Sequence, residues 1–228
     1  MNRLTLPSLA IFSFALFLFV LPSHAAKLKP LEQAGAHQQS SDVFFTSSIN
    51  RLSGLAGFQC QFDQRMVFSD GGSQHFSGEV AVLKPKRFRW SYHQPYEQLY
   101  VGDGSVIWHY EPDLLQAERL NDLDQVDPAV MKLLDGRVSV KDVEILNQKQ
   151  DSEFEIRYYQ VRIGDSAAIW LGFNKQGDLI AIERKDMLGN SNRMKLSECS
   201  YVAPSVNLFS FAPPEGVDLL DLRTAYSE

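Results

Sequence analysis

The chain has 228 residues, a formal net charge of −6 at pH 7 and 44% hydrophobic residues, which is typical of a folded globular protein. Acidic residues outnumber basic ones by 28 to 22, which argues against nucleic acid as a partner because phosphate binding requires a local excess of Lys and Arg. The sequence shows no internal linker, so we expect a single domain over residues 42–228.

Residues 1–25 have the pattern of a cleaved signal peptide. Arg3 supplies a short positive region, residues 9–21 form an apolar stretch, and Ser23 and Ala25 are small residues at the positions that signal peptidase reads. The apolar stretch is too short to span a bilayer with a margin for tilt. We therefore expect cleavage after Ala25, export from the cytoplasm and no membrane-spanning helix in the mature chain.

A polar segment and then a helix are expected at the start of the mature chain. Residues 26–41 are polar and aperiodic, which predicts a flexible N-terminal segment. Ser41 or Asp42 can cap a helix that runs from Asp42 to Leu55. Apolar side chains on one face of this helix recur at spacings of four, three and four: Phe45, Ile49, Leu52 and Ala56.

From Phe58 onward, apolar and polar residues alternate in short runs separated by turn residues. This pattern predicts about nine to eleven strands. A second, short helix is expected from Asp127 to Leu134, where Pro128 suits the first helical position. Short connections favour antiparallel neighbours, so we predict a mainly β (α+β) fold in which the sheet curls into part of a barrel and the helices cap its concave side.

The run from Lys84 to Ala117 is rich in aromatic residues on alternate positions. Phe88, Trp90 and Tyr92 share one parity, and Trp108 and Tyr110 share another after a glycine-containing turn. We expect both sets to face the same side of the sheet. Such a face either fills a core or lines a cavity for an apolar ligand, and periodicity leaves both readings open.

No constellation of residues typical of catalysis or metal binding is apparent. The histidines of the mature chain are isolated from one another in sequence: His37, His75, His93 and His109. Ser105 lacks the second glycine of a nucleophile elbow, and no glycine-rich loop joins a strand to a helix. We therefore expect no enzymatic activity, no metal site and no cofactor.

Cys60 and Cys199 are the two cysteines of the chain. In an oxidising compartment they could form a disulfide. By reducing the entropy of the unfolded chain, such a bond would stabilise the fold by about 4 to 5 kcal/mol. They could equally be two small apolar core residues, because the sequence does not give the distance between them.

Several motifs in order along the chain resemble one known family. The resemblance lies in FxCxFxQ at residues 58–64, LKPKRFRW at 83–90, QPYEQLYVGDGSVIWHYEPDLLQA at 94–117 and FSFAPPEGVD at 209–218. Together these motifs are similar to LolA, the family of periplasmic outer-membrane lipoprotein carriers.

The resemblance implies an unclosed antiparallel β-barrel with an α-helical lid, in a monomeric periplasmic protein. It also implies that the cargo is acylated lipoproteins, taken from an inner-membrane ABC transporter of the Lol type and passed to a LolB-type outer-membrane acceptor. The two cysteines depart from members of the family that lack them. Two alternatives remain: a periplasmic sensor of lipids or lipoproteins, and a carrier of another amphiphile such as a glycolipid.

The resemblance also suggests site residues. Phe88 and Trp90 correspond to an F-x-W pair of the family, and with Phe62, Trp108 and Tyr110 they are expected to line a lipid-binding cavity. Lys84 takes the basic position before Pro85 and is the candidate for a latch that donates hydrogen bonds to lid carbonyls. An exposed turn lysine is the alternative interpretation of Lys84.

Overall fold

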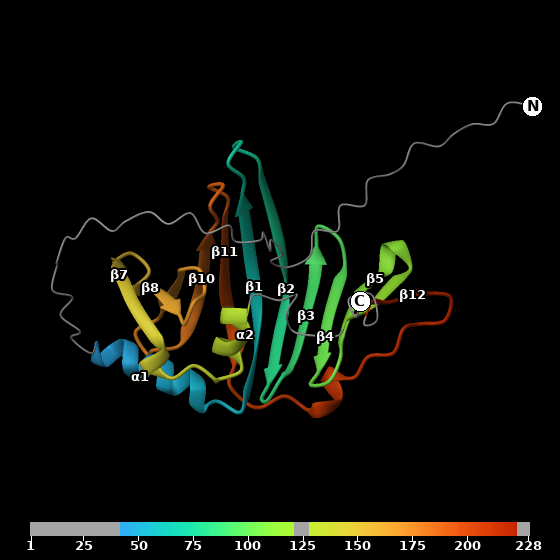
Figure 1. Cartoon of the computed structure of the whole chain (residues 1–228), viewed down its shortest axis with the longest axis horizontal. Helices are drawn as coiled ribbons and strands as arrows, with labels where there is room; N and C mark the ends of the chain where they lie inside the picture. Colours follow the sequence, from blue (N-terminus) through green and yellow to red (C-terminus); the bar gives the residue numbers. More distant parts are fainter. Residues whose placement is uncertain (1–41, 121–127, 223–228) are drawn as a thin grey trace, which may run out of the picture.

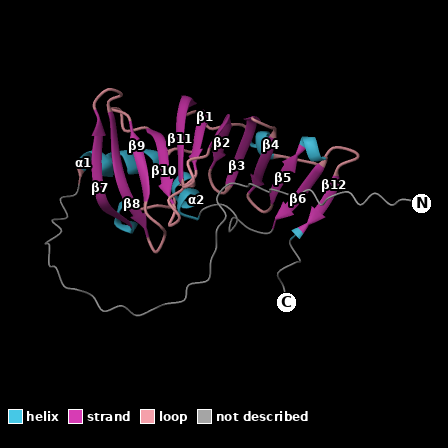
Figure 2. Ribbon diagram, turned by 90° about the horizontal axis from the view of Figure 1, so that it is seen from above, coloured by secondary structure: helices cyan, strands magenta, loops and turns pink. Residues whose placement is uncertain are grey.

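The computed structural model describes residues 42–120 and 128–222. This part of the chain forms one curved β-sheet with two α-helices against one face (Figure 1, Figure 2). We call the face that the helices cover the inner face, and the opposite one the outer face. The predicted signal peptide, residues 1–25, and the predicted flexible segment, residues 26–41, lie outside the described residues.

Twelve strands occur in the described residues, against the nine to eleven expected. In chain order they are β1 (Gly57–Val67), β2 (Ser73–Leu83), β3 (Arg87–Gln94), β4 (Gln98–Asp103), β5 (Ile107–Glu111), β6 (Gln116–Leu120), β7 (Val143–Asp151), β8 (Ile156–Ile163), β9 (Ile169–Phe173), β10 (Leu179–Lys185), β11 (Ser191–Ser200) and β12 (Asp218–Asp221). Across the sheet the order is β12-β6-β5-β4-β3-β2-β1-β11-β10-β9-β8-β7.

The sheet is antiparallel throughout except at one edge, where β12 pairs with β6 in parallel. Strands β1 to β6 and β7 to β11 form two meanders, and the pairing of β1 with β11 joins them. The sheet ends at β12 and at β7 and does not close on itself. The predicted fold, an unclosed antiparallel barrel covered by helices, is therefore confirmed.

Two α-helices cover the inner face, α1 (Val43–Gly54) and α2 (Pro128–Leu134). The Asp42 carboxylate accepts a hydrogen bond from Phe45 N at 2.9 Å, which caps α1 as expected. The apolar face of α1 is buried in the same core as the inner face of the sheet. Helix α2 contributes three buried side chains to that core: Met131, Leu133 and Leu134. No helix among the described residues is long and apolar enough to cross a membrane.

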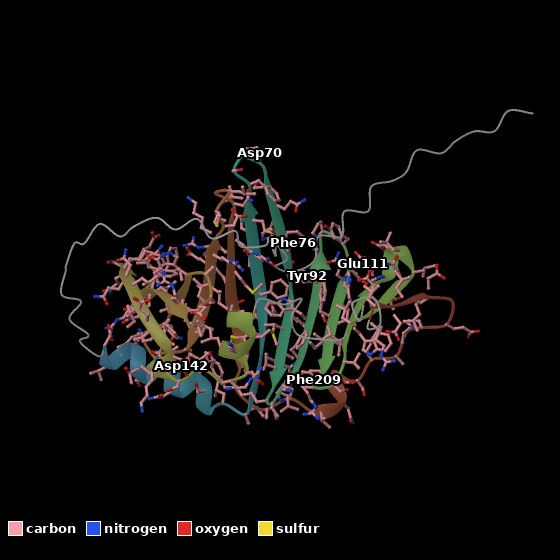
Figure 3. The ribbon with its side chains drawn as sticks, in the orientation of Figure 1. Asp70, Phe76, Tyr92, Glu111, Asp142 and Phe209 are labelled. Carbon is pink, nitrogen blue, oxygen red and sulfur yellow. A yellow bond between two sulfur atoms is a disulfide. The ribbon has the colours of Figure 1, made fainter. Side chains whose placement is uncertain are left out.

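Three short 3-10 helices complete the described secondary structure: η1 (Pro112–Leu114), η3 (Val140–Asp142) and η4 (Val206–Phe209). Figure 3 shows that Asp142 and Phe209, at the ends of η3 and η4, lie at the same end of the sheet as α1. Asp70, in the turn between β1 and β2, lies at the far end. Helix α1 and the 3-10 helices η3 and η4 thus lie at one end of the curved sheet.

Cys60 and Cys199 form a disulfide, which decides between the two alternatives that the sequence left open. The bond links β1 to β11, the pair of strands at which the two meanders meet, and it joins residues 139 positions apart. Cys60 is buried among the core residues of the inner face. The bond therefore fastens the sheet at the strand pair that joins its two halves.

Candidate functional site

The inner face of β1 to β3 is apolar and aromatic. Phe62, Phe88 and Trp90 are each at most 3% exposed and belong to the core that α1 and α2 cover. The rings of Phe62 and Trp90 meet edge to face, with centroids 5.9 Å apart. Gly102 lies opposite Phe88, and a Cβ there would approach the Phe88 ring to 2.4 Å. The structure therefore brings together three of the five residues that the sequence suggested for a cavity.

The prediction that Trp108 and Tyr110 share this face is wrong. Directly paired residues of antiparallel strands project to the same side. Trp90 pairs with Tyr100, and Tyr100 with His109, so the inner-facing residue of β5 at this level is His109 rather than Trp108.

Trp108 and Tyr110 lie on the outer face, where both rings pack against Phe211, with centroids 5.7 and 5.4 Å away. The segment that follows η4 thus covers the outer face of β5. Because both faces of β5 are covered, aromatic alternation along this strand could not indicate which face is the inner one.

Lys84 lies at the end of β2 and contacts the C-terminal end of α1. Its Nζ donates to Leu52 O at 2.6 Å and to Ser53 O at 3.1 Å. These carbonyls belong to the last turn of α1, where carbonyl groups lack partners further along the helix. A cation at a helix C-terminus also interacts favourably with the helix dipole. Lys84 is thus not the freely exposed turn lysine of the alternative interpretation.

Residues of the α2 end complete the surroundings of Lys84. Burial lowers the pKa of Lys84, and the nearby Asp135 carboxylate opposes this shift. Asp135 also accepts a hydrogen bond from Lys86 N at 2.6 Å, so it ties the end of α2 to the turn between β2 and β3. Gly136 has φ of +68°, and a Cβ there would lie 2.6 Å from Lys84 Nζ. Only glycine leaves room for Lys84 to reach α1.

Two further contacts hold α1 to the β7–β11 half of the sheet. Tyr159 Oη on β8 donates to Asp42 Oδ2 at 2.9 Å, and this hydrogen bond together with burial raises the pKa of Tyr159 to about 12. Arg51 Nε donates to Asp178 Oδ1 at 2.7 Å, between α1 and the turn before β10. Sequence reasoning missed both contacts, and no local pattern reveals a pair separated by more than a hundred residues.

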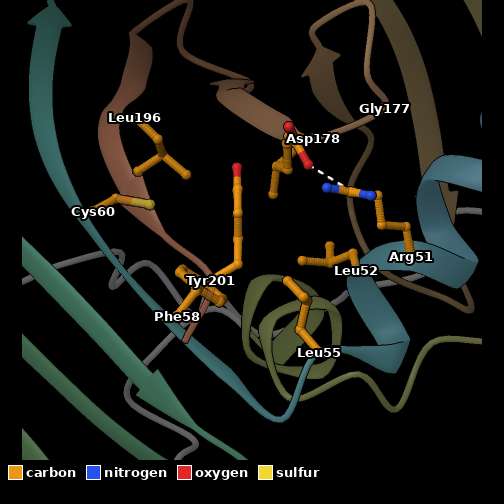
Figure 4. Close-up of a pocket in the computed structure, with 10 residues that line it drawn as sticks. Arg51, Leu52, Leu55, Phe58, Cys60, Gly177, Asp178, Leu196 and Tyr201 are labelled. Atoms are coloured by element: carbon orange, nitrogen blue, oxygen red, sulfur yellow. Dashed lines mark hydrogen bonds and ion pairs between the residues drawn. The ribbon is translucent and has the colours of Figure 1, made fainter. Parts of the chain in front are cut away.

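A small pocket lies beneath the C-terminal half of α1 (Figure 4). Its walls include Leu52 and Leu55 from the helix side and Phe58, Cys60 and Leu196 from the sheet. The cavity volume is about 10 Å³, which is close to the minimum that holds one water molecule. Ligand pockets typically measure about 300 to 1,000 Å³, so an acyl chain enters here only if α1 moves.

The inner face changes character across β4 to β6, where polar residues replace apolar ones. His109 Nδ1 lies 3.2 Å from Glu118 Oε2, and Gln98 Nε2 donates to Glu111 Oε1 at 2.9 Å. The Tyr100 and His109 rings stack with centroids 4.2 Å apart. Figure 3 labels Glu111 on this side of the sheet and Tyr92 on the neighbouring apolar side. The sequence carried no signal for this region, because polar alternation along β5 predicts that His109 and Glu111 face outward.

Comparison with known proteins shows which family this chain belongs to. The profile described as "Outer membrane lipoprotein carrier protein LolA" matches residues 53–212. The chain belongs to the LolA family. An outer-membrane lipoprotein carrier protein from Chromobacterium violaceum is 33% identical over 174 residues, 74% of this chain and 83% of the relative. One of the same description from Nitrosomonas europaea is 33% identical over 175 residues, 72% of this chain and 82% of the relative.

A solved structure supports the fold alone. An uncharacterized conserved protein from Thermus thermophilus has a TM-score of 0.51 at 12% identity, over 78% of this chain and 96% of that one. The descriptions of the family and of these relatives name a carrier of outer-membrane lipoproteins. Among the described residues, no group of His, Cys, Asp and Glu side chains is arranged to hold a metal ion.

Proposed function

We propose that this protein is a periplasmic carrier that binds the acyl chains of lipoproteins. In this proposal the cargo arrives from an inner-membrane ABC transporter of the Lol type and leaves to a LolB-type outer-membrane acceptor. The carrier works as a monomer and needs no cofactor. Membership of the LolA family supports the cargo class, and the apolar inner face supports the manner of binding.

The observation that carries the proposal is the aromatic inner face of the sheet, which shares its core with a helix. Few polar contacts hold that helix to the sheet. Phe62, Phe88 and Trp90 offer the apolar surface on which acyl chains lie. Burying acyl chain gains about 0.8 kcal/mol per methylene, so a protein carrying several long chains requires such a cover in water. Without cargo, α1 packs its own apolar side chains into the same core, with Phe45 against Tyr159 and Phe173, and so keeps the neighbouring part of the inner face out of water.

Helices α1 and α2 act as the lid in this proposal, closed without cargo and open with it. The polar contacts of α1 with Lys84, Tyr159 and Asp178 are its fastenings. Opening breaks these contacts, so part of the gross binding energy is used to open the lid and net affinity falls. This cost lets the carrier shield acyl chains and still lose them, without a nucleotide, to an acceptor that binds them more tightly.

A lid-to-sheet crosslink tests the proposal. A Cβ at Gly177 would lie 3.6 Å from Ser48 Cβ, which is within the range of disulfides, so Ser48→Cys with Gly177→Cys should couple α1 to the turn before β10. We expect the crosslinked protein to take up no lipoprotein from membranes, while each single variant keeps its uptake. Peptide mapping establishes that the new bond has formed beside Cys60–Cys199. Wild-type uptake by the crosslinked protein would show that the lid does not open.

A further inference from the structure

Three polar atoms with no hydrogen-bond partner in the described part of the chain lie on adjacent strands of the inner face. They are Trp90 Nε1 on β3, Tyr100 Oη on β4 and His109 Nε2 on β5. The side chains are only 3 to 4% exposed, so water does not readily satisfy these atoms. Buried polar atoms in native proteins are nearly always hydrogen-bonded, and exceptions often mark a functional site.

The strand register places these atoms in one row. Trp90 pairs directly with Tyr100, Tyr100 with His109, and His109 with Glu118. We call these four residues the polar row. Neighbouring members project to the same face from strands that are about 4.8 Å apart. The row is therefore a line of polar groups that runs across β3 to β6.

The chemistry of the row is fixed by what each member can donate or accept. Trp90 has only an N–H donor, and burial raises the pKa of Tyr100, so its phenol stays protonated and can donate. The carboxylate of Glu118 is an acceptor, so His109 Nδ1 donates its proton there, which turns Nε2 away from Glu118. The row thus offers two donors, Trp90 Nε1 and Tyr100 Oη, and beside them one further nitrogen, His109 Nε2, to a ligand.

The row lies at a boundary between two kinds of surface. Toward β1 and β2, the residues in register with Trp90 are Val80 and Cys60, which are apolar and buried. The next level toward the lysine end of β2 is apolar across the sheet: Phe58, Val82, Phe88, Ile107 and Leu120. A ligand that matches this pattern has long apolar chains joined to a compact group rich in carbonyl oxygens.

We infer that the polar row binds the ester and amide carbonyls that join the acyl chains of the cargo to its polypeptide. The chains then extend from the row toward β1 and α1, and the polypeptide leaves over β4 to β6. This inference rests on the proposed function, since it assigns the head of the same cargo to a place on the same face. Trp90 and Tyr100 are the donors to these carbonyls, and His109 Nε2 faces the same group from the next strand.

Tyr100→Phe is the variant of choice, because it removes one donor and keeps the ring that stacks on His109. The Tyr100 hydroxyl has no partner in the described part of the chain, so its removal should raise the thermal midpoint of the cargo-free protein. If the hydroxyl had a merely structural role, its removal would lower the thermal midpoint instead. Tyr110→Phe is the matched control, since Tyr110 lies on the outer face against Phe211.

The experiment measures the affinity of two synthetic lipopeptides with identical chains, one a diester and the other the corresponding diether. We expect wild-type protein to bind the diester about tenfold more tightly, and Tyr100→Phe to reduce that ratio about fivefold with little change in diether affinity, as expected for one net hydrogen bond. Comparing the ratio across variants isolates the coupling between the hydroxyl and the carbonyl.

Each result has a distinct meaning. Failure of the wild-type protein to bind either lipopeptide overturns the proposed function. Binding of both with equal affinity, or an unchanged ratio in Tyr100→Phe, overturns the role of the polar row alone. A reduced ratio in Tyr110→Phe also overturns it, because the effect would then not come from the inner face.

Discussion

Replacing Lys84 with Met removes the ammonium group that fastens the C-terminal end of α1 and keeps an unbranched stem of similar length. The two hydrogen bonds to Leu52 O and Ser53 O are lost. Hydrogen bonds from a charged donor contribute about 1.5 to 3 kcal/mol each, and the desolvation that lowers the pKa of Lys84 offsets part of this. We expect closure of α1 to weaken by about 2 kcal/mol, or about 30-fold in the ratio of closed to open protein.

The consequence of this change is tighter binding and slower release. If only the open form binds, apparent affinity rises as the open fraction grows, by up to about 30-fold. Titration with a fluorescent lipopeptide measures the affinity, and transfer to an acceptor protein measures the release. We expect Lys84→Met to bind more tightly than wild type and to transfer more slowly.

Lys86→Met is the matched control, since Lys86 lies in the same turn with an exposed side chain and makes its contact to Asp135 through the backbone N–H. Thermal unfolding checks that both variants are folded. Equal affinity and equal transfer rates in Lys84→Met and wild type would show that Lys84 does not hold the lid.

Three further predictions concern stability. Replacing both Cys60 and Cys199 with Ala should lower the free energy of unfolding by about 4 to 5 kcal/mol in denaturant titrations, because the bond closes a long loop, and an unchanged value would refute this. Gly136→Ala should cost more than about 1 kcal/mol in the same assay, since φ is +68° and the new Cβ displaces Lys84, while Gly54→Ala, whose Cβ meets nothing within 4 Å, should cost far less. The hydrogen bond from His109 holds the pKa of Glu118 below its ordinary value of 4.5, so the stability from this carboxylate is present above pH 4.5 and is lost as the pH falls through the lowered pKa. Wild type should therefore lose more free energy of unfolding than Glu118→Gln on acidification, and parallel losses would exclude this contribution.

Local patterns in the sequence predicted most of the fold. Alternation gave the strands, and the cap at Asp42 with apolar residues at helical spacing gave α1, because these features depend on neighbours within a few positions. Local patterns did not predict which face of β5 lies on the inner side of the sheet. In β5 the inner parity carries His109 and Glu111, while Phe211 covers Trp108 and Tyr110 on the outer face, so the alternation predicts the wrong face for these two rings.

The contacts that hold the lid could likewise not be predicted from local sequence patterns. The family resemblance, rather than a local pattern, suggested Lys84 as a latch, and its contacts with α1 carbonyls 31 and 32 positions away agree with the geometry expected of one. The contacts Asp42–Tyr159 and Arg51–Asp178 join residues 117 and 127 positions apart, and the disulfide joins residues 139 apart. Such pairs follow from the order of strands in the sheet, which short-range periodicity does not determine.

The most direct test of the central claim is release of lipoprotein from the inner membrane. Purified protein is added to spheroplasts that are synthesising a labelled lipoprotein, and the supernatant is separated by size. We predict that the lipoprotein appears in the supernatant as a one-to-one complex with this protein, in an amount that depends on the protein added. Retention of the lipoprotein in the membrane pellet, with and without the protein, would contradict the account.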